Sequence, residues 1–103
     1  MENRILGLLG ISMKAGKVIF GTDACIEKIG KKKVDLIIIA EDASERTKSH
    51  LQAICEKNNI SIVVYSNIEK ISKSIGKVNK AVIGIREKNL ANQIKQLIYR
   101  GEN

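Results

Sequence analysis

The sequence predicts an α/β fold, a three-layer α/β/α sandwich around a four-stranded mixed sheet. Segments whose apolar residues recur at helical spacing alternate along the 103 residues with four short runs rich in β-branched residues. One of these runs is almost entirely apolar, which is typical of a strand covered on both faces. Because no proline, repeat or linker divides the chain, we expect one domain over residues 1–103.

The first third of the chain predicts a helix, a short strand and a second helix. Residues 3–15 carry apolar side chains three and four positions apart, and the glycine that follows ends this helix. Residues 17–20 form the first predicted strand. Gly21 breaks the strand, and the second predicted helix extends from there to about Gly30.

The middle third contains the predicted central strand. Residues 34–40 are apolar at almost every position, so we expect this strand to be buried on both faces. The segment Glu41-Asp42-Ala43-Ser44 predicts a turn and the cap of a third helix, which extends to about Lys57. Residues 60–65 form the third predicted strand.

The last third predicts a short helix, a strand and a final helix. The segment Ser66-Asn67-Ile68-Glu69 matches a capping box, which opens the short helix. Residues 76–79 form a loop, residues 80–85 the fourth strand, and residues 88–100 an amphipathic helix.

The charge of the chain is the first indication of function. Eighteen Lys and Arg residues against eleven Asp and Glu residues give a net charge of +7. Residues 1–33 carry +4, residues 34–72 carry −2, and residues 73–103 carry +5. If the two basic parts meet in space, they form a positive face that suits a polyanion, most simply nucleic acid.

The aromatic content restricts how nucleic acid could be bound. Phe20, Tyr65 and Tyr99 are the only aromatic residues of the sequence. RNA-binding sheets that stack bases use several exposed aromatic side chains, and this chain lacks such a set. Binding would therefore rest on backbone groups, lysines and the shape of the RNA.

Little in the sequence supports an enzyme. His50 is the one histidine, and we expect it on the solvated face of the third helix. No glycine-rich phosphate motif and no cluster with metal-ligand spacing is present, so we expect neither a cofactor nor a metal. Glu41 and Asp42 follow the central strand, where α/β enzymes place carboxylates, but their simpler role is to cap the third helix.

The cysteines and the apolar runs bear on the compartment. Cys25 and Cys55 lie thirty residues apart, which fits two buried thiols in a reducing compartment. No apolar run approaches the roughly 18 residues of a membrane span, and the first residues make a poor signal peptide. We expect a cytoplasmic protein with no membrane partner.

Two features could bind phosphate. The turn Gly21-Thr22-Asp23 lies between a strand and a helix, where a close backbone approach and free N–H groups form an anion site. Lysines precede this turn, close the second helix and lie in the later loop: Lys14, Lys17, Lys28, Lys31, Lys32 and Lys77. The alternative is a purely solvated cluster whose charges favour the end of the helix dipole.

Four stretches, in order, carry a resemblance to a known family. They are Lys14-Ala-Gly-Lys-Val-Ile-Phe-Gly21, the strand that ends in Ala40-Glu-Asp-Ala-Ser44, Ile71-Ser-Lys-Ser-Ile-Gly76, and Ala81-Val-Ile-Gly-Ile85. Together they resemble the ribosomal protein L7Ae/L30e superfamily, and more closely its small bacterial YlxQ-like branch. The resemblance covers the chain from Leu6 to about Leu97.

The resemblance implies an α/β/α sandwich that binds RNA without catalysis. In the kink-turn binders of the family, the second helix begins Gly-x-Asn-Glu-x-x-Lys. Gly21 matches this pattern here, whereas Asp23, Ala24 and Glu27 stand where Asn, Glu and Lys would be. The family's later loop offers apolar residues to a flipped-out base, and in Gly76-Lys77-Val78-Asn79 only Val78 fits that role.

We therefore expect a non-catalytic, ribosome-associated or ribosomal-protein-like protein. It would recognise a bent, kink-turn-like RNA, ribosomal or otherwise, through the start of the second helix, with Glu41, Asp42, Ala43 and residues 76–79 shaping the site. Ribosomal or translation proteins are further candidate partners. Two alternatives stay open: a protein-interaction module that docks through acidic residues 34–72, and an enzyme that uses Glu41 or Asp42.

Overall fold

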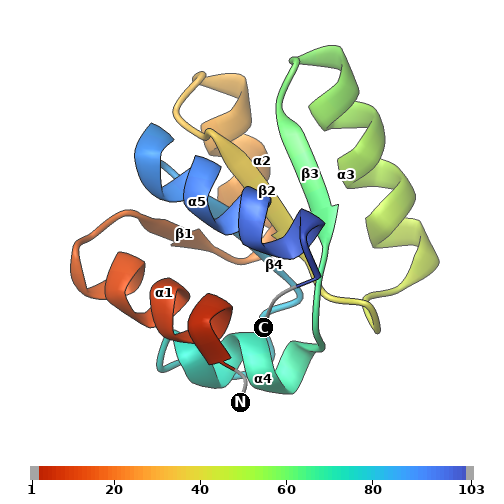
Figure 1. Ribbon diagram of the computed structural model, residues 1–103. Coiled ribbons are helices and arrows are strands. Elements are labelled where there is room, and N and C mark those ends of the chain that lie inside the picture. The colour runs from red at the N-terminus through yellow and green to blue at the C-terminus, as the bar shows by residue number, and fades with distance from the viewer. Residues whose placement is uncertain (1–2, 102–103) are drawn as a thin grey trace.

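The computed structural model describes residues 3–101, which form five helices and four strands (Figure 1). The elements are α1 (Asn3–Lys14), β1 (Val18–Phe20), α2 (Thr22–Gly30), β2 (Leu36–Ile39), α3 (Glu45–Lys57), β3 (Ser61–Val64), α4 (Ile68–Ser74), β4 (Val82–Ile85) and α5 (Lys88–Tyr99). Every predicted element is present, and each strand is shorter than its predicted range.

The four strands form one mixed sheet, as predicted, and their order in it is β1-β4-β2-β3. Strand β4 is antiparallel to both of its neighbours, while β2 and β3 are parallel. Phe20 pairs with Ile83, and Ile39 pairs with Val82. Strands β1, β2 and β3 therefore finish where β4 starts; we call this the carboxyl end of the sheet, and the opposite end the amino end.

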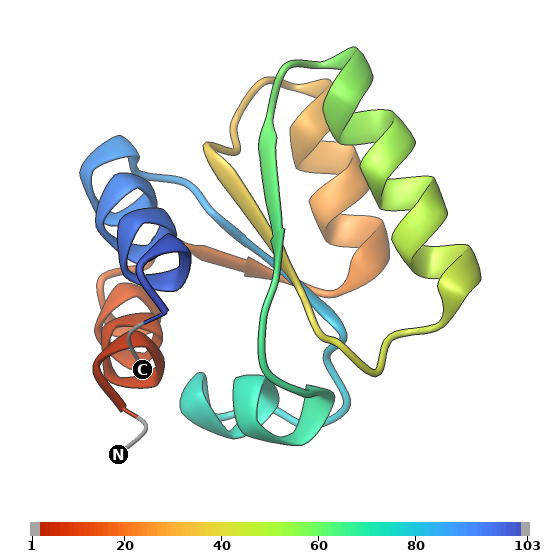
Figure 2. The same cartoon turned by 45° about the vertical axis from the view of Figure 1, so that its right-hand side comes forward.

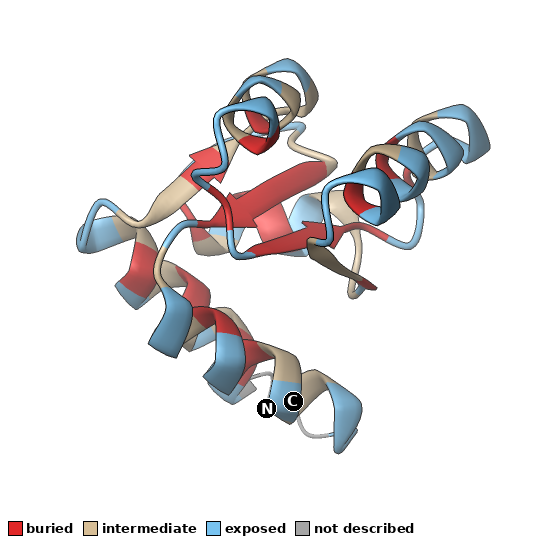
Figure 3. Cartoon of the chain, turned by 90° about the horizontal axis from the view of Figure 1, so that it is seen from above, coloured by how far each residue is buried: buried red, intermediate tan, exposed pale blue. Residues whose placement is uncertain are grey.

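Helices cover both faces of the sheet, which confirms the three layers (Figure 2). The alternating side chains of β2 divide between the layers: Leu36 and Ile38 pack in the cluster that α1, α4 and α5 cover, and Ile37 and Ile39 pack in the cluster under α2 and α3. All four side chains are fully buried. Seen from above, the buried residues concentrate in the strands and in the inward stripes of the helices (Figure 3).

Strand β4 begins two residues later than predicted because Lys80 is held by a side chain instead of a strand. The Lys80 amide donates to the Ser72 hydroxyl at 2.7 Å, and the same hydroxyl donates to the Lys80 carbonyl at 3.3 Å. Regular sheet pairing begins only at Val82.

The predicted capping box is wrong about the residue that caps α4. Asn67 is the N-cap, and its side chain accepts a hydrogen bond from the Lys70 amide at 2.8 Å. Ser66 has a φ of 60°, which places it outside the extended conformation typical of an N-cap. The cap of α3 is Ser44, whose hydroxyl accepts from the Thr47 amide at 3.1 Å, as the turn prediction implied.

Candidate nucleic-acid interface

The carboxyl end of the sheet brings together three segments that the sequence predicted as one site. They are the Gly21 turn, the Glu41–Ala43 turn and the Gly76–Asn79 loop. Backbone hydrogen bonds join them through the start of β4: the Gly21 amide donates to the Val82 carbonyl, and the Ala40 amide to the Ala81 carbonyl, both at 2.9 Å. Residues more than fifty positions apart thus become neighbours.

Gly21 has the left-handed backbone that the predicted anion site requires. Its φ of 98° and ψ of 146° are open to glycine and rare for other residues. Helix α2 starts at the next residue, and no side chain among those described makes a capping hydrogen bond there. The first amides of α2 are therefore available to an anion, which the positive end of the helix dipole also favours.

Two lysines of the loop before β4 lie over the ring of Phe20. The Nζ of Lys77 is 4.8 Å from the ring centroid, and that of Lys80 is 5.5 Å from it. Both distances suit cation–π attraction. The Phe20 ring packs against the cluster that α1, α4 and α5 cover, whereas α2 covers the other face of the sheet. The two ammonium groups therefore lie at the carboxyl end of the sheet, over the residue that precedes Gly21.

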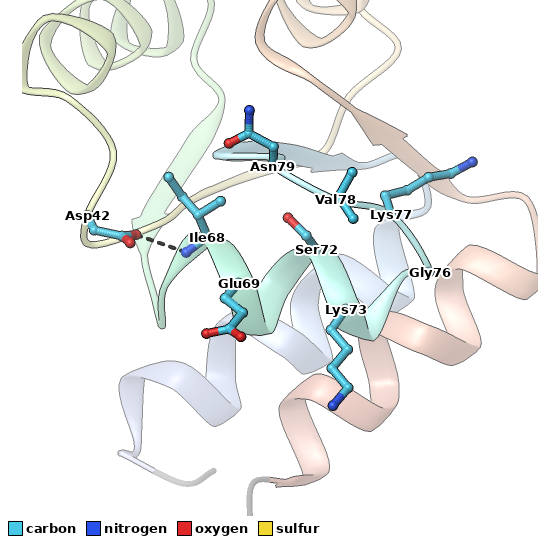
Figure 4. Close-up of a pocket in the computed structure, with 9 residues that line it drawn as sticks. All are labelled: Asp42, Ile68, Glu69, Ser72, Lys73, Gly76, Lys77, Val78 and Asn79. Atoms are coloured by element: carbon cyan, nitrogen blue, oxygen red, sulfur yellow. Dashed lines mark hydrogen bonds between the residues drawn. The ribbon is translucent and has the colours of Figure 1, made fainter.

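A shallow pocket of about 660 Å³ opens between α4 and the loop that follows it (Figure 4). Val78 lies at its rim and is 81% exposed. The residues that line it are Asp42, Ile68, Glu69, Ser72, Lys73, Gly76, Lys77, Val78 and Asn79. Five of the predicted site residues therefore share one concave surface.

The carboxylate of Asp42 has a structural partner. Its Oδ1 accepts a hydrogen bond from the Ile68 amide at 2.8 Å (Figure 4). Asp42 thus caps α4, whereas we expected it to cap the third helix. The reason is topological: β2 and β3 are parallel neighbours, so the turn after β2 lies beside the chain that leaves β3. Of its neighbours, Glu41 is exposed and Ala43 is buried.

The predicted lysines do not join this site as one group. Lys17 precedes β1 and accepts, through its carbonyl, a 2.9 Å bond from the Arg86 amide at the end of β4. Helix α2 leads away from Gly21, so Lys28, Lys31 and Lys32 also lie toward the amino end of the sheet. The predicted site therefore separates into a group at the carboxyl end and a basic group at the amino end, about 14 Å apart along α2.

Two residues that sequence reasoning had not selected adjoin the carboxyl-end site. Phe20 orients Lys77, and the only signal in the sequence was its position next to Gly21. Arg46 lines a small pocket with Thr22, Thr47 and His50, which brings a cation from α3 toward the start of α2. Nothing in the local sequence places the α3 residues opposite Thr22, since that contact depends on how the helices pack.

The two cysteines are not activated nucleophiles. Cys25 and Cys55 are free and buried, and burial raises the pKa of the Cys25 thiol to about 12 and that of Cys55 to about 11. Both thiols stay protonated near neutral pH, which makes them poor nucleophiles. Between residues 3 and 101 no group of three or more His, Cys, Asp or Glu side chains could hold a metal ion.

The family assignment follows from a comparison with known sequences. The model of the ribosomal protein L7Ae/L30e/S12e/Gadd45 family matches residues 3–95. The chain belongs to this family. The residues that the family model matches include all three segments at the carboxyl end of the sheet.

Individual relatives agree with this assignment. The chain is 32% identical to an RNA-binding protein YlxQ of Enterococcus faecium, covering 94% of this chain and 93% of that protein. It is 31% identical to the Bacillus subtilis protein of the same name, over 88% and 91% of the two chains. An archaeal large ribosomal subunit protein eL8 from Picrophilus torridus is 27% identical over 82% of this chain and 68% of its own.

Solved structures share the fold. A Bacillus halodurans protein described as of unknown function superposes with a TM-score of 0.92, at 28% identity over 95% of this chain and 99% of that one. The Giardia lamblia 15.5kD RNA binding protein has a TM-score of 0.78 at 18% identity, over 97% and 89% of the two chains, which supports the fold alone. In the part of the chain that is described, none of the helices has the length and apolar character that crossing a membrane requires.

Proposed function

We propose that this protein is a non-catalytic RNA-binding protein that recognises a bent, kink-turn-like RNA at the carboxyl end of its sheet. The observation that carries the proposal is the convergence of the uncapped start of α2 with the loop of Lys77 and Val78. Two relatives at 31% and 32% identity are named RNA-binding proteins, which supports the same class of ligand.

Each part of this site has a role that follows from its chemistry. The Gly21 turn lets the RNA backbone approach closely, and the amides at the start of α2, including those of Thr22 and Asp23, offer donors to it. The Lys77 ammonium, which lies over the Phe20 ring, supplies positive charge at the same end of the sheet, and the apolar Val78 side chain offers a surface to an unstacked base. Asp42 positions α4, and Asn79 lines the same pocket.

Two of the departures from the family pattern, Asp23 and Glu27, are compatible with the proposed site. Asp23 is exposed and keeps an oxygen acceptor where the pattern has Asn. Glu27 lies one turn further along α2 and forms an ion pair with Lys31 at 3.3 Å, which offsets its repulsion of phosphate. The pattern's lysine at this position is lost, and the ammonium groups over Phe20 supply positive charge from another segment.

The test is a fluorescence-anisotropy titration with three RNAs at two salt concentrations. They are a kink-turn hairpin, a straight duplex of matched length, and the hairpin with its G·A pairs disrupted. We expect the intact kink-turn to bind at least about tenfold more tightly than either control, a difference of about 1.4 kcal/mol. With six phosphate contacts, log K would fall by about 5 per decade of salt.

A single substitution locates the binding site. Lys77→Gln should weaken kink-turn binding and flatten the salt slope by about 1 unit. Lys70→Gln is the matched control, because it removes the same charge from α4 on the side that faces α1.

In the titration with the unmodified protein, equal binding to all three RNAs would contradict kink-turn recognition. An absence of binding at low salt would contradict RNA binding and favour a protein partner.

A further inference from the structure

The amino end of the sheet gathers basic residues from three separate connections. Lys17 comes before β1, Lys31, Lys32 and Lys33 lie between α2 and β2, and Arg86 follows β4, next to Lys88 at the start of α5. The Arg86 amide donates to the Lys17 carbonyl at 2.9 Å, and the Asp35 amide donates to the Ile85 carbonyl at 2.8 Å. The three connections therefore lie side by side at the amino end of the sheet, whereas the Gly21 turn lies at the carboxyl end.

These cations are open to solvent. Lys31, Lys32, Lys33, Arg86 and Lys88 are exposed, and Lys17 is half-buried. We refer to these six residues as the amino-end surface. A partner larger than the surface could reach all of them at once.

Few acidic groups offset this charge, and most of them are already engaged. Glu27 pairs with Lys31 at 3.3 Å. The Glu87 carboxylate caps α5 by accepting hydrogen bonds from the amides of Leu90 at 2.8 Å and Asn89 at 3.1 Å, which lowers its pKa. Asp35 is the exposed acid that remains nearby. The surface keeps a net positive charge beyond these contacts.

Lys32 holds its position at a conformational cost. Its φ is 58°, and the amides of Lys32 and Lys33 donate to the carbonyls of Ile29 and Lys28 in the pattern of a Schellman motif. Glycine or asparagine is favoured at this position, because the left-handed backbone brings the Cβ atom of other residues too close to the following carbonyl oxygen. The chain therefore has a lysine at position 32, between two other lysines, where a glycine would make the fold more stable.

We infer that the amino-end surface binds the sugar–phosphate backbone of an RNA duplex, independently of the site at the carboxyl end. Exposed lysine and arginine side chains bind phosphates, and the narrow major groove of an RNA duplex prevents side chains from reading its bases. The two surfaces point away from each other, so the protein can hold a bent RNA and a second duplex together. The inference shares with the proposed function only that the ligand is RNA, because the residues and the RNA shape differ.

The test uses a straight RNA duplex of about 20 base pairs without a kink-turn, a length chosen to exceed the roughly 16 base pairs that a double-stranded-RNA-binding domain covers. The first variant carries Lys32→Gly, Lys33→Gln and Arg86→Gln. The control carries Arg4→Gln, Lys70→Gln and Arg100→Gln, which removes the same charge from two pockets that residues of α1 help to line. We expect the first variant to bind the duplex at least about tenfold more weakly, with a salt slope smaller by about 2 to 3 units, and the control to change little.

The outcomes separate this inference from the proposed function. If both triple variants lose duplex binding equally, only net charge matters and the amino-end surface is not a site. If the unmodified protein binds no straight duplex at low salt, the inference is overturned, whether or not the kink-turn binds. If the first variant also loses its preference for the kink-turn over the duplex, the two ends are not independent. Circular dichroism melting of each variant confirms that it is folded.

Discussion

At the residue scale, the positive-φ positions show where local preference and sequence disagree. Asn59 and Asn79 have φ values near 57°, which asparagine tolerates better than most residues. Lys32 has the same backbone conformation without that tolerance. Its side chain therefore contributes charge to the amino-end surface while its backbone opposes the fold.

Replacing Lys32 by glycine should stabilise the protein. Lys32→Gly relieves the left-handed strain, and we expect the free energy of unfolding to rise by about 1 kcal/mol. Lys33→Gly is the control: Lys33 has no positive φ, so its replacement should be neutral or destabilising. Urea unfolding measures the free energy of unfolding of both variants. A destabilised Lys32→Gly protein would show that the lysine makes a compensating contact.

At the element scale, side-chain hydrogen bonds connect both ends of α4 to other segments of the chain. Asp42 from the turn after β2 caps its first amide, and Ser72, which is 2% exposed, reaches out to Lys80. Because α4 has only seven residues, its own hydrogen bonds give it little stability. These tethers therefore fix the loop that presents Lys77 and Val78.

Removing the Ser72 hydroxyl should loosen this loop. Ser72→Ala leaves the Lys80 amide and carbonyl without the partner that both use, and we expect a loss of about 1 to 3 kcal/mol. Ser74→Ala is the control, because the Ser74 hydroxyl only donates to the Ile71 carbonyl within α4. Hydrogen exchange at the Lys80 amide should accelerate in the first variant. An unchanged rate would mean that the loop is held by its other contacts.

At the scale of the whole molecule, the sheet joins the two apolar layers, and β2 lies near its centre. Ile37 and Ile38 are adjacent in β2 and point into different clusters, and both are fully buried. Neither layer can keep its core if β2 leaves the sheet. We therefore propose that the layers unfold as one unit.

Matched substitutions test this coupling. Ile37→Val and Ile38→Val each remove one buried methylene group, and each should lower the free energy of unfolding by about 1 kcal/mol. Hydrogen exchange in α2 and α5, on opposite faces of the sheet, should accelerate to the same extent in both variants. Acceleration confined to the helix nearest each substitution would show that the layers unfold separately.

The sequence by itself determined the type and order of every element and the burial of β2. Apolar spacing carries this information, because a helix and a strand repeat along the chain with different periods. It also supplied the Gly21 turn and the residues of the later loop, since glycine positions are local signals. The family resemblance stated from four short stretches is confirmed by the family model.

Only the tertiary structure decided which of these residues are neighbours. The strand order β1-β4-β2-β3 placed Lys77 over Phe20, gave Asp42 a partner in α4, and sent Lys17, Lys31 and Lys32 to the end of the sheet opposite Gly21. Strand order depends on contacts between residues far apart in sequence, and no local pattern encodes them. The basic residues of the two basic parts of the sequence are therefore divided, in space, between the two ends of the sheet.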